Sequence, residues 1–303
     1  MSLWGNGIAV QDRRAISAAD QQYYEEEFRG NWVQLHGSFY IWREHYDALK
    51  EWERHRLKVL AVGKQAHRAV VVGRAAAVLW GFGVLEASFP IELAYPGSGR
   101  PPPRRKWAPG IRYRTMYLPR AEILEGKGVA YTSAARTVVD TCRWGSFADG
   151  IVVAESYLRA GYRKSELWRV LRGIGRGHGV AKARRVLSHA TGKSESVAES
   201  LAKSQIIEAG VDTRSVVQNA EMVVGRRGRR ADFIIDGWLV IEVDGEIKYD
   251  GTYGDPAFVI KLERERERDF LNAGYTLYRV KWRDLCDGSF ISGLRRLLER
   301  GPR

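Results

Sequence analysis

The stretch ADFIIDGWLVIEV, residues 231–243, decides the fold of the C-terminal part of the chain. Two runs rich in β-branched and aromatic residues flank Asp236-Gly237, and an Asp-Gly pair between such runs predicts a β-hairpin with a tight turn. Upstream, Ser196 to Gly210 has a helical stripe of apolar residues, with Ser196 and Glu199 spaced as a capping box and Gly210 as its stop.

Further elements extend the pattern on both sides of the hairpin. Ser215 to Val224 is typical of a strand, and Gly225 to Arg230 of a basic turn. A second helix is predicted with Asp255 as N-cap, Pro256 in its first position and Gly274 just past its end. A strand from Thr276 to Trp282 and a helix around Leu294 to Leu298 follow. This order predicts an α/β sheet flanked by helices.

The turn decides whether the hairpin carboxylates meet. A two-residue loop would pair Asp232 with Ile241 and turn Glu242 to the other face. A three-residue loop with Gly237 in the left-handed region would instead place Asp232 opposite Glu242, about 5 Å apart at Cβ. Asp244 lies on the face of Glu242 because strand side chains alternate. We favour the second register.

Converging carboxylates repel one another unless a cation lies between them. Asp232 and Glu242 are therefore the predicted ligands of Mg²⁺ or Mn²⁺, beside Asp244. Such an ion activates water for phosphodiester hydrolysis. Lys248 could orient that water, and Glu199 could add a further carboxylate.

Each of these residues also has a structural explanation. Helix capping alone accounts for Glu199 and is the favoured interpretation from local sequence. Asp236 is typical of a turn, and Asp244 with Gly245 could simply end the strand. Glu242 is the exception, because it stands inside WLVIEV, which otherwise has the pattern of a buried strand. A buried carboxylate needs a cation, a partner or a proton.

Composition narrows the function classes. Hydrophobic residues make up 45% of the 303 residues and charged residues 28%, as in ordinary globular proteins. No apolar run approaches the roughly 20 residues of a membrane span, and no secretory signal is recognisable, so we expect a cytoplasmic protein without a membrane partner. Two cysteines are too few for a disulfide framework, and all six histidines precede residue 190, so a histidine-based site is not expected further on.

The net charge of +13 is placed unevenly. Residues 194–303 hold 18 Lys and Arg against 19 Asp and Glu, whereas residues 1–193 hold 31 against 17. This asymmetry predicts a basic nucleic-acid-binding domain over 1–193 and a different domain over 194–303, with the boundary at Gly192-Lys193-Ser194. A basic surface kept for solubility is the alternative.

The N-terminal domain is predicted to be mixed α+β. Gly30 to Tyr40 has the pattern of a short hairpin around Gly37, and helices are expected between Tyr46 and Val62 and between Thr132 and His189. Three prolines, 101–103, exclude a helix or central strand and predict an exposed basic loop. The residues of this loop predicted to contact nucleic acid are Arg104, Arg105 and Lys106, and the basic turn of the C-terminal domain adds Arg229 and Arg230.

The C-terminal motifs together resemble a bacterial endonuclease-like domain related to very-short-patch-repair enzymes of the PD-(D/E)XK superfamily. The resemblance covers residues 194–303 and rests on SESVAESLAKSQIIEAG, Gln218, RADFIIDGWLVIEVDGEIKYDG, ERERE and GYTLYRVKWRDL. It implies Glu199 as the helix carboxylate, and Asp232 and Glu242 as the two acidic residues of the motif. Lys248 falls where relatives in this family have His or Lys after the Glu-Val-Asp-Gly run. Arg266, Phe270 and Arg279 match a helix-and-strand signature of the family that includes arginines near the site. Two departures are that Asp244 replaces the usual motif lysine and that the histidines of repair enzymes are missing.

The N-terminal half is similar to proteins associated with AbiEi-type antitoxins of toxin–antitoxin systems. The stretches GNWVQLHGSFYI, RAAAVLWGFG and YTSAARTVVDTCR carry this resemblance. It implies a DNA-binding winged helix, here a partial one, and a toxin as a possible partner. Two hypotheses follow: a Mg²⁺-dependent endonuclease acting on nucleic acid, DNA in preference to RNA, or a DNA-binding antitoxin or repressor whose nuclease-like domain is not catalytic.

Overall fold

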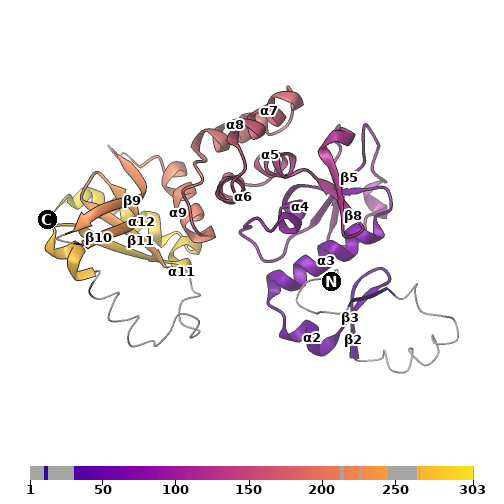
Figure 1. Cartoon of the computed structure of the whole chain (residues 1–303), viewed down its shortest axis with the longest axis horizontal. Helices are drawn as coiled ribbons and strands as arrows, with labels where there is room; N and C mark the ends of the chain where they lie inside the picture. Colours follow the sequence, from indigo (N-terminus) through magenta and orange to yellow (C-terminus); the bar gives the residue numbers. More distant parts are fainter. Residues whose placement is uncertain are drawn as a thin grey trace. The chain divides into compact units, whose positions relative to one another are not determined.

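A computed structural model of the chain describes residues 10–12, 31–211, 215–224, 227–244, 265 and 267–302 (Figure 1). The protein is a mixed α+β protein, as its sequence predicts. It divides into two compact units. The first comprises residues 1–145 and 164–184, and the second comprises residues 146–163 and 185–303. No helix in the described ranges is long and apolar enough to cross a membrane.

The first unit begins with a small antiparallel sheet. Its strands are β1 (Val10–Asp12), β2 (Trp32–His36) and β3 (Phe39–Trp42), in the order β1-β3-β2. Gly37, with φ +55°, forms the turn between β2 and β3, and glycine adopts this left-handed backbone at no steric cost. The predicted hairpin is therefore confirmed. The segment that would carry a helix preceding it falls in residues 13–30, outside the described residues, so the winged helix stays a prediction.

Two helices follow, α2 (Arg43–Ala48) and α3 (Glu51–Gln65), in place of the single helix expected over 46–62. Residues of helix α3 pack into two hydrophobic clusters. Leu57 and Ala61 pack on the hairpin residues Leu35 and Ile41. Val59, Leu60 and Val62 lie against a second sheet.

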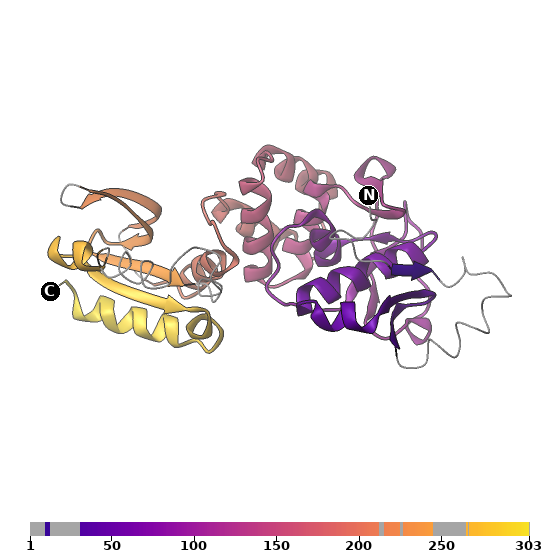
Figure 2. The same ribbon diagram turned by 60° about the horizontal axis from the view of Figure 1, so that its bottom comes forward.

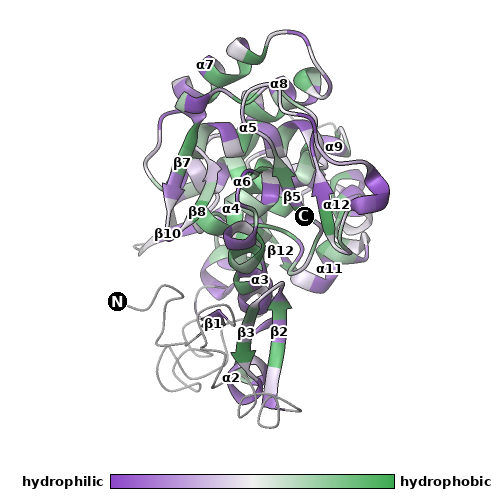
Figure 3. Cartoon of the chain, turned by 90° about the vertical axis from the view of Figure 1, so that its right-hand side faces the viewer, coloured by the Kyte–Doolittle hydropathy of each residue, from purple (hydrophilic) through white to green (hydrophobic). Residues whose placement is uncertain are grey.

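That second sheet has five strands in the order β6-β5-β4-β8-β7. Helices α3 and α4 (Gly73–Trp80) pack on it, α5 (Ala134–Trp144) packs on α4, and α7 (Lys164–Ile174) packs on α5. Helices α7 and α8 (Val180–His189) carry hydrophilic and hydrophobic residues side by side, as amphipathic helices do (Figure 3). The strands are β4 (Val70–Val71), β5 (Ile91–Ala94), β6 (Ile111–Tyr113), β7 (Ile123–Gly126) and β8 (Val129–Thr132).

The second unit contains the decisive hairpin. Its four strands lie in the order β12-β11-β10-β9 (Figure 2). Strand β10 (Arg227–Ile235) is antiparallel to both of its neighbours, β9 (Val216–Val224) and β11 (Leu239–Asp244). Strand β12 (Thr276–Lys281) is parallel to β11. The helices around it are α6 (Phe147–Arg159), α9 (Val197–Glu208), α11 (Trp282–Cys286), α12 (Ser289–Arg300) and a helical segment at 265 and 267–272.

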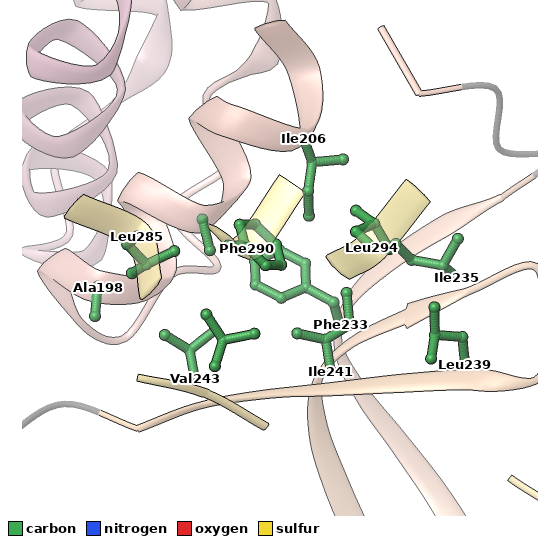
Figure 4. Packing of buried hydrophobic residues seen from close by; sticks show 12 residues of the cluster. Ala198, Ile206, Phe233, Ile235, Leu239, Ile241, Val243, Leu285, Phe290 and Leu294 are labelled. Atoms are coloured by element: carbon green, nitrogen blue, oxygen red, sulfur yellow. The ribbon is translucent and has the colours of Figure 1, made fainter. Parts of the chain in front are cut away.

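The main core of this unit lies on one face of the sheet. Alternate hairpin residues, Phe233, Ile235, Leu239, Ile241 and Val243, pack against Ile206 of α9 and against Leu285, Phe290 and Leu294 of α11 and α12 (Figure 4). On the other face Ile234 and Val240 contact Phe270. Because both faces are covered, a charged side chain in these strands is forced toward the interior unless it lies at a strand end.

Two parts of the sequence prediction need correction. The arginine run does not form a turn from Gly225 to Arg230, because β9 continues to Val224 and Arg227–Arg230 pair with it as the start of β10. The division into units also differs from a boundary at 192–194. Helix α6 belongs with the C-terminal unit, since its buried Glu155 binds the backbone N–H groups of Thr191 and Ser194 and the ammonium of Lys203.

Candidate metal and nucleic-acid site

The hairpin adopts the register in which Asp232 and Glu242 can face each other. Phe233 pairs with Ile241 and Ile235 with Leu239, which leaves a three-residue loop at 236–238. Gly237 has φ +74°, as the favoured register requires. Asp236 has φ +50°, and its Oδ1 accepts a hydrogen bond of 3.0 Å from the Ser215 N–H, so its role in the turn is confirmed.

The two strands separate just beyond the last pair, Phe233 and Ile241. The next position along this register sets Asp232 opposite Glu242. The Asp232 carboxylate replaces a ladder bond there, because its Oδ2 accepts 2.7 Å from the backbone N–H of Val243. This contact fixes the Asp232 side chain beside the backbone of Glu242.

A row of polar residues crosses the sheet at this level. Glu242 is paired with Arg279 on the parallel strand β12. The flanking pairs Ala231–Ala220 and Phe233–Gln218 set Asn219 level with Asp232, at a break in the ladder where Asn219 has φ +50°. We call Asn219, Asp232, Glu242 and Arg279 the polar row. On β10 and β11 it shares the face of Ile234 and Val240, which pack on Phe270.

Burial makes the polar row chemically unusual. Glu242 is only 7% exposed. Within the described part of the chain, the buried Oδ1 of Asn219 has no hydrogen-bond partner, and neither has the buried Nε of Arg279. Asn219 is held by its amide, which donates to the carbonyl of Lys193. A carbonyl oxygen and two carboxylates beside one another are hard donors of the kind that Mg²⁺ and Mn²⁺ prefer.

Glu199 lies close to this row but is used by its own helix. Ser196 caps α9 by accepting 3.0 Å from the Glu199 N–H, so the capping interpretation is confirmed. The Glu199 carboxylate accepts from the Ser196 hydroxyl at 2.9 Å and from the Glu195 N–H at 2.8 Å. Burial raises the pKa of Glu199, and the nearby negative charge of Asp232 raises it further. Glu199 and Asp232 are therefore electrostatic neighbours.

The remaining predicted residues are placed less centrally. Asp244 is half-buried at the end of β11, next to Lys281 rather than in the polar row. Lys248 and Arg266 lie outside the described residues. Among the residues that are described, no three His, Cys, Asp or Glu side chains converge as a metal site. The pair Asp232 and Glu242 is what the fold brings together.

The arginines predicted to contact nucleic acid fall into two groups. In the second unit, Arg229 Nε donates 3.0 Å to Asp269, Arg230 donates 2.6 Å to Glu195, and Arg279 lies 3.7 Å from Glu267. In the first unit, Arg104, Arg105 and Lys106 form an exposed turn of 3-10 helix. Among the described arginines, Arg229 and Arg230 are therefore engaged by carboxylates at hydrogen-bond distance, whereas Arg104, Arg105 and Lys106 form no ion pair with a described residue.

Asn219 was not predicted as a site residue. It could have been predicted from the strand pairing, because pairing residues 216–224 with residues 227–235 brings Asn219 level with Asp232. The predicted turn at 225–230 hid that register. A scan of the chain against protein-family models finds no match, and a search among curated proteins finds no significant relative.

Proposed function

We propose that the protein is a metal-dependent nuclease in which Asp232 and Glu242 hold a Mg²⁺ or Mn²⁺ ion. The observation that carries this proposal is Glu242, a carboxylate 7% exposed that lies in a row between Asp232 and Arg279. An ionised carboxylate is costly to bury unless it is paired, hydrogen-bonded or bound to a cation, and this cost exceeds that of burying a neutral polar group. A cation beside it offsets that cost.

The donors fit such an ion. Mg²⁺ sites in phosphate-processing enzymes use one or two carboxylates and retain several waters, so two acidic residues suffice. Bound there, the ion would activate water and screen the charge on a phosphate oxygen. The unpartnered Oδ1 of Asn219 is a further oxygen at the same level of the sheet.

The protein's own side chains would do the remaining work. Arg279 stands next to Glu242, and a guanidinium can bind a phosphate oxygen through two N–H groups and offset negative charge. Asp232, fixed by the Val243 N–H, keeps its carboxylate oriented without reorganisation. Lys248 is proposed to orient the attacking water.

The substrate class follows from charge. Residues 1–193 carry 31 Lys and Arg against 17 Asp and Glu, which favours a polyanion. The three exposed cations Arg104, Arg105 and Lys106 would contact its phosphates. We propose nucleic acid as the substrate, and DNA in preference to RNA.

A second candidate is a DNA-binding antitoxin or repressor with a non-catalytic second unit. The observation in its favour is that the Glu199 carboxylate serves the N-terminus of α9 and that Arg229 and Arg230 are engaged by Asp269 and Glu195. Under this proposal Arg279 would compensate Glu242 as part of the fold, and a toxin would be the partner.

The decisive experiment is a cleavage assay. Wild type, Glu242→Gln and the control Asp236→Asn are incubated with circular plasmid, single-stranded DNA and structured RNA, in Mn²⁺ and in EDTA. Asp236→Asn removes a carboxylate from the same hairpin while keeping an acceptor for the Ser215 N–H. Cleavage by wild type and Asp236→Asn alone, and only with metal, supports the nuclease. Binding without cleavage by all three proteins supports the antitoxin or repressor.

A further inference from the structure

A pocket that no part of the proposed metal site uses lies at the edge of the five-stranded sheet. It has a volume of about 450 Å³ and is formed between β6 and the turn at 104–106. The residues that line it include three arginines, Arg104, Arg112 and Arg114, and two aromatic residues, Trp107 and Tyr113. No acidic side chain lines it among the residues that the structure describes. This volume is in the range of sites that hold small organic ligands.

The aromatic wall is ordered by its own contacts. Trp107 Nε1 donates 2.8 Å to the carbonyl of Pro102, which fixes the indole. The Trp107 ring lies 5.6 Å from Tyr113, and Tyr113 stacks on Tyr95 at 5.9 Å with an interplanar angle of 8°. Three rings thus form a continuous strip along the sheet edge.

The cations of this pocket are available to a ligand. Arg104 and Arg112 are exposed, and neither forms an ion pair with a residue that the structure describes. The guanidinium of Arg104 lies 5.7 Å from the centroid of the Trp107 ring. Arg114 differs, since it binds Glu92 and stacks 4.8 Å over Trp144. Arg114 therefore belongs to the frame, and Arg104 and Arg112 to the binding surface.

The aromatic and the basic residues of the pocket together favour one kind of ligand. Flat rings beside uncompensated guanidinium groups suit a molecule with an aromatic face and an anionic group, as a nucleotide has. The pKa of Tyr113 is raised by burial and by neighbouring Tyr95, so the hydroxyl remains neutral and adds no repulsion toward a phosphate. In a duplex the base faces are covered by stacking, whereas an unpaired base offers its face to an aromatic side chain.

We infer that this pocket binds single-stranded nucleic acid, with a base on Trp107 and Tyr113 and its backbone phosphates on Arg104 and Arg112. Arg105 and Lys106 extend the basic surface next to it. The inference does not depend on the proposed nuclease, because the pocket belongs to the first unit and binding there needs neither metal nor cleavage.

The test measures binding with full-length protein carrying Glu242→Gln, in EDTA, so that no cleavage interferes. Fluorescence anisotropy compares a labelled oligo(dT), a duplex of equal length and a labelled thymidine monophosphate. Trp107→Ala is expected to weaken oligo(dT) binding by about fivefold or more, because the loss of stacking on one aromatic residue has an effect of that size. Arg104→Ala with Arg112→Ala is expected to weaken it too. For each phosphate that these arginines no longer neutralise, the slope of log K against log salt should become shallower by about 0.7.

Two matched controls are Trp52→Ala and Arg176→Ala. Trp52 is a 50% exposed indole on α3, and Arg176 is an exposed arginine of the same unit. Both should bind oligo(dT) within about twofold of the parent protein. Circular dichroism checks that Trp107→Ala is folded, and the arginine variant alters only surface side chains.

Three results would overturn the inference. They are unchanged binding by both the Trp107 and the arginine variants, equal binding of duplex and oligo(dT) with equal losses on mutation, and thymidine monophosphate binding as tightly as the oligonucleotide. The last result would make the pocket a site for a free nucleotide. Absence of cleavage by the wild-type protein in Mn²⁺, together with oligo(dT) binding that depends on Trp107, would count against the metal site alone.

Discussion

The Asp232 carboxylate accepts a 2.7 Å hydrogen bond from the backbone N–H of Val243, the residue after Glu242, at the point where the hairpin strands separate. One side-chain contact therefore ends the ladder and brings two acidic residues to the same level of the sheet. Further along the hairpin, both faces of the strands are covered by apolar residues. The opening of the hairpin is thus where a charge can be placed and oriented.

We predict that Mn²⁺ raises the melting temperature of wild type and that Asp232→Asn abolishes most of the rise. A ligand at 100 times its dissociation constant stabilises the folded state by about 2.7 kcal/mol. Asparagine keeps an acceptor for the Val243 N–H, so the hairpin should survive while one anionic donor is lost. Differential scanning fluorimetry with and without metal measures the effect. Asp236→Asn is the control, and an equal rise in Asp232→Asn would contradict metal binding at this pair.

The N-terminus of α9 gives a second prediction. Ser196→Ala should lower the free energy of unfolding by about 1 kcal/mol, because the Glu199 N–H loses its acceptor. Glu199→Gln should leave the Mn²⁺-dependent rise in melting temperature intact, since the Glu199 carboxylate is bound to Glu195 and Ser196. Urea unfolding measures the first effect and scanning fluorimetry the second. Loss of the metal response in Glu199→Gln would assign Glu199 to the metal site.

The decisive hairpin could be predicted because local chemistry specifies it. Asp236 and Gly237 both take left-handed backbone conformations that suit these residue types, and the apolar alternation leaves one register that buries the core face. Strands β9 and β12 and helices α9 and α12 were recognisable for the same reason, whereas Asp255 and Pro256, the predicted start of another helix, lie outside the described residues. What failed was the run of arginines at 227–230, where local polarity predicted a turn.

That failure has a long-range cause. Arg229 and Arg230 can occupy a strand because Asp269 and Glu195 lie beside them, 40 and 35 residues away in the chain. The same holds for α6, whose Glu155 finds its partners 36 to 48 residues further on. No local pattern encodes such contacts. For the same reason Asn219 could be placed in the polar row only once the register of β9 was known.

The Glu155 cluster gives the third prediction. This carboxylate is fully buried and accepts 2.6 Å from Lys203, 2.8 Å from the Thr191 N–H and 3.1 Å from the Ser194 N–H. Burial alone would raise the pKa of Glu155, but Lys203 and the backbone donors outweigh it and lower the pKa. Glu155→Gln should cost about 3–5 kcal/mol in the second unit, because it leaves a buried ammonium without its counter-charge.

Two comparisons make this third prediction specific. Glu86→Gln breaks an ion pair in which Glu86 is largely exposed, with Arg74 at 3.2 Å, and should cost less than about 1 kcal/mol. Glu155→Leu combined with Lys203→Met should recover much of the loss, since it removes both charges together. Urea unfolding followed by circular dichroism measures all four proteins. A cost for Glu155→Gln as small as that of Glu86→Gln would show that the cluster is not stabilising.

A fourth prediction concerns pH and the first unit. His55 on α3 is 4% exposed, and its ring lies 4.3 Å from that of Phe89. Burial, and then the positive charges of Lys58 and Arg74, lower the pKa of His55 from 6.5 to about 4. The unfolded chain takes up a proton on His55 at a higher pH than the folded protein does. The contribution of neutral His55 to the free energy of unfolding is therefore fully present above about pH 6.5. It is lost as the pH falls toward 4.

Between pH 6.5 and pH 5 this linkage should remove about 1.6 kcal/mol from the free energy of unfolding, with the slope approaching 1.36 kcal/mol per pH unit toward pH 5. His55→Leu should show a correspondingly flatter profile over this interval, whatever its stability at neutral pH. His67→Asn, at an exposed histidine two residues past the end of α3, is the control and should keep the wild-type slope. The measurement is urea unfolding at half-unit steps of pH. A wild-type slope in His55→Leu would show that the acid sensitivity of the first unit arises elsewhere.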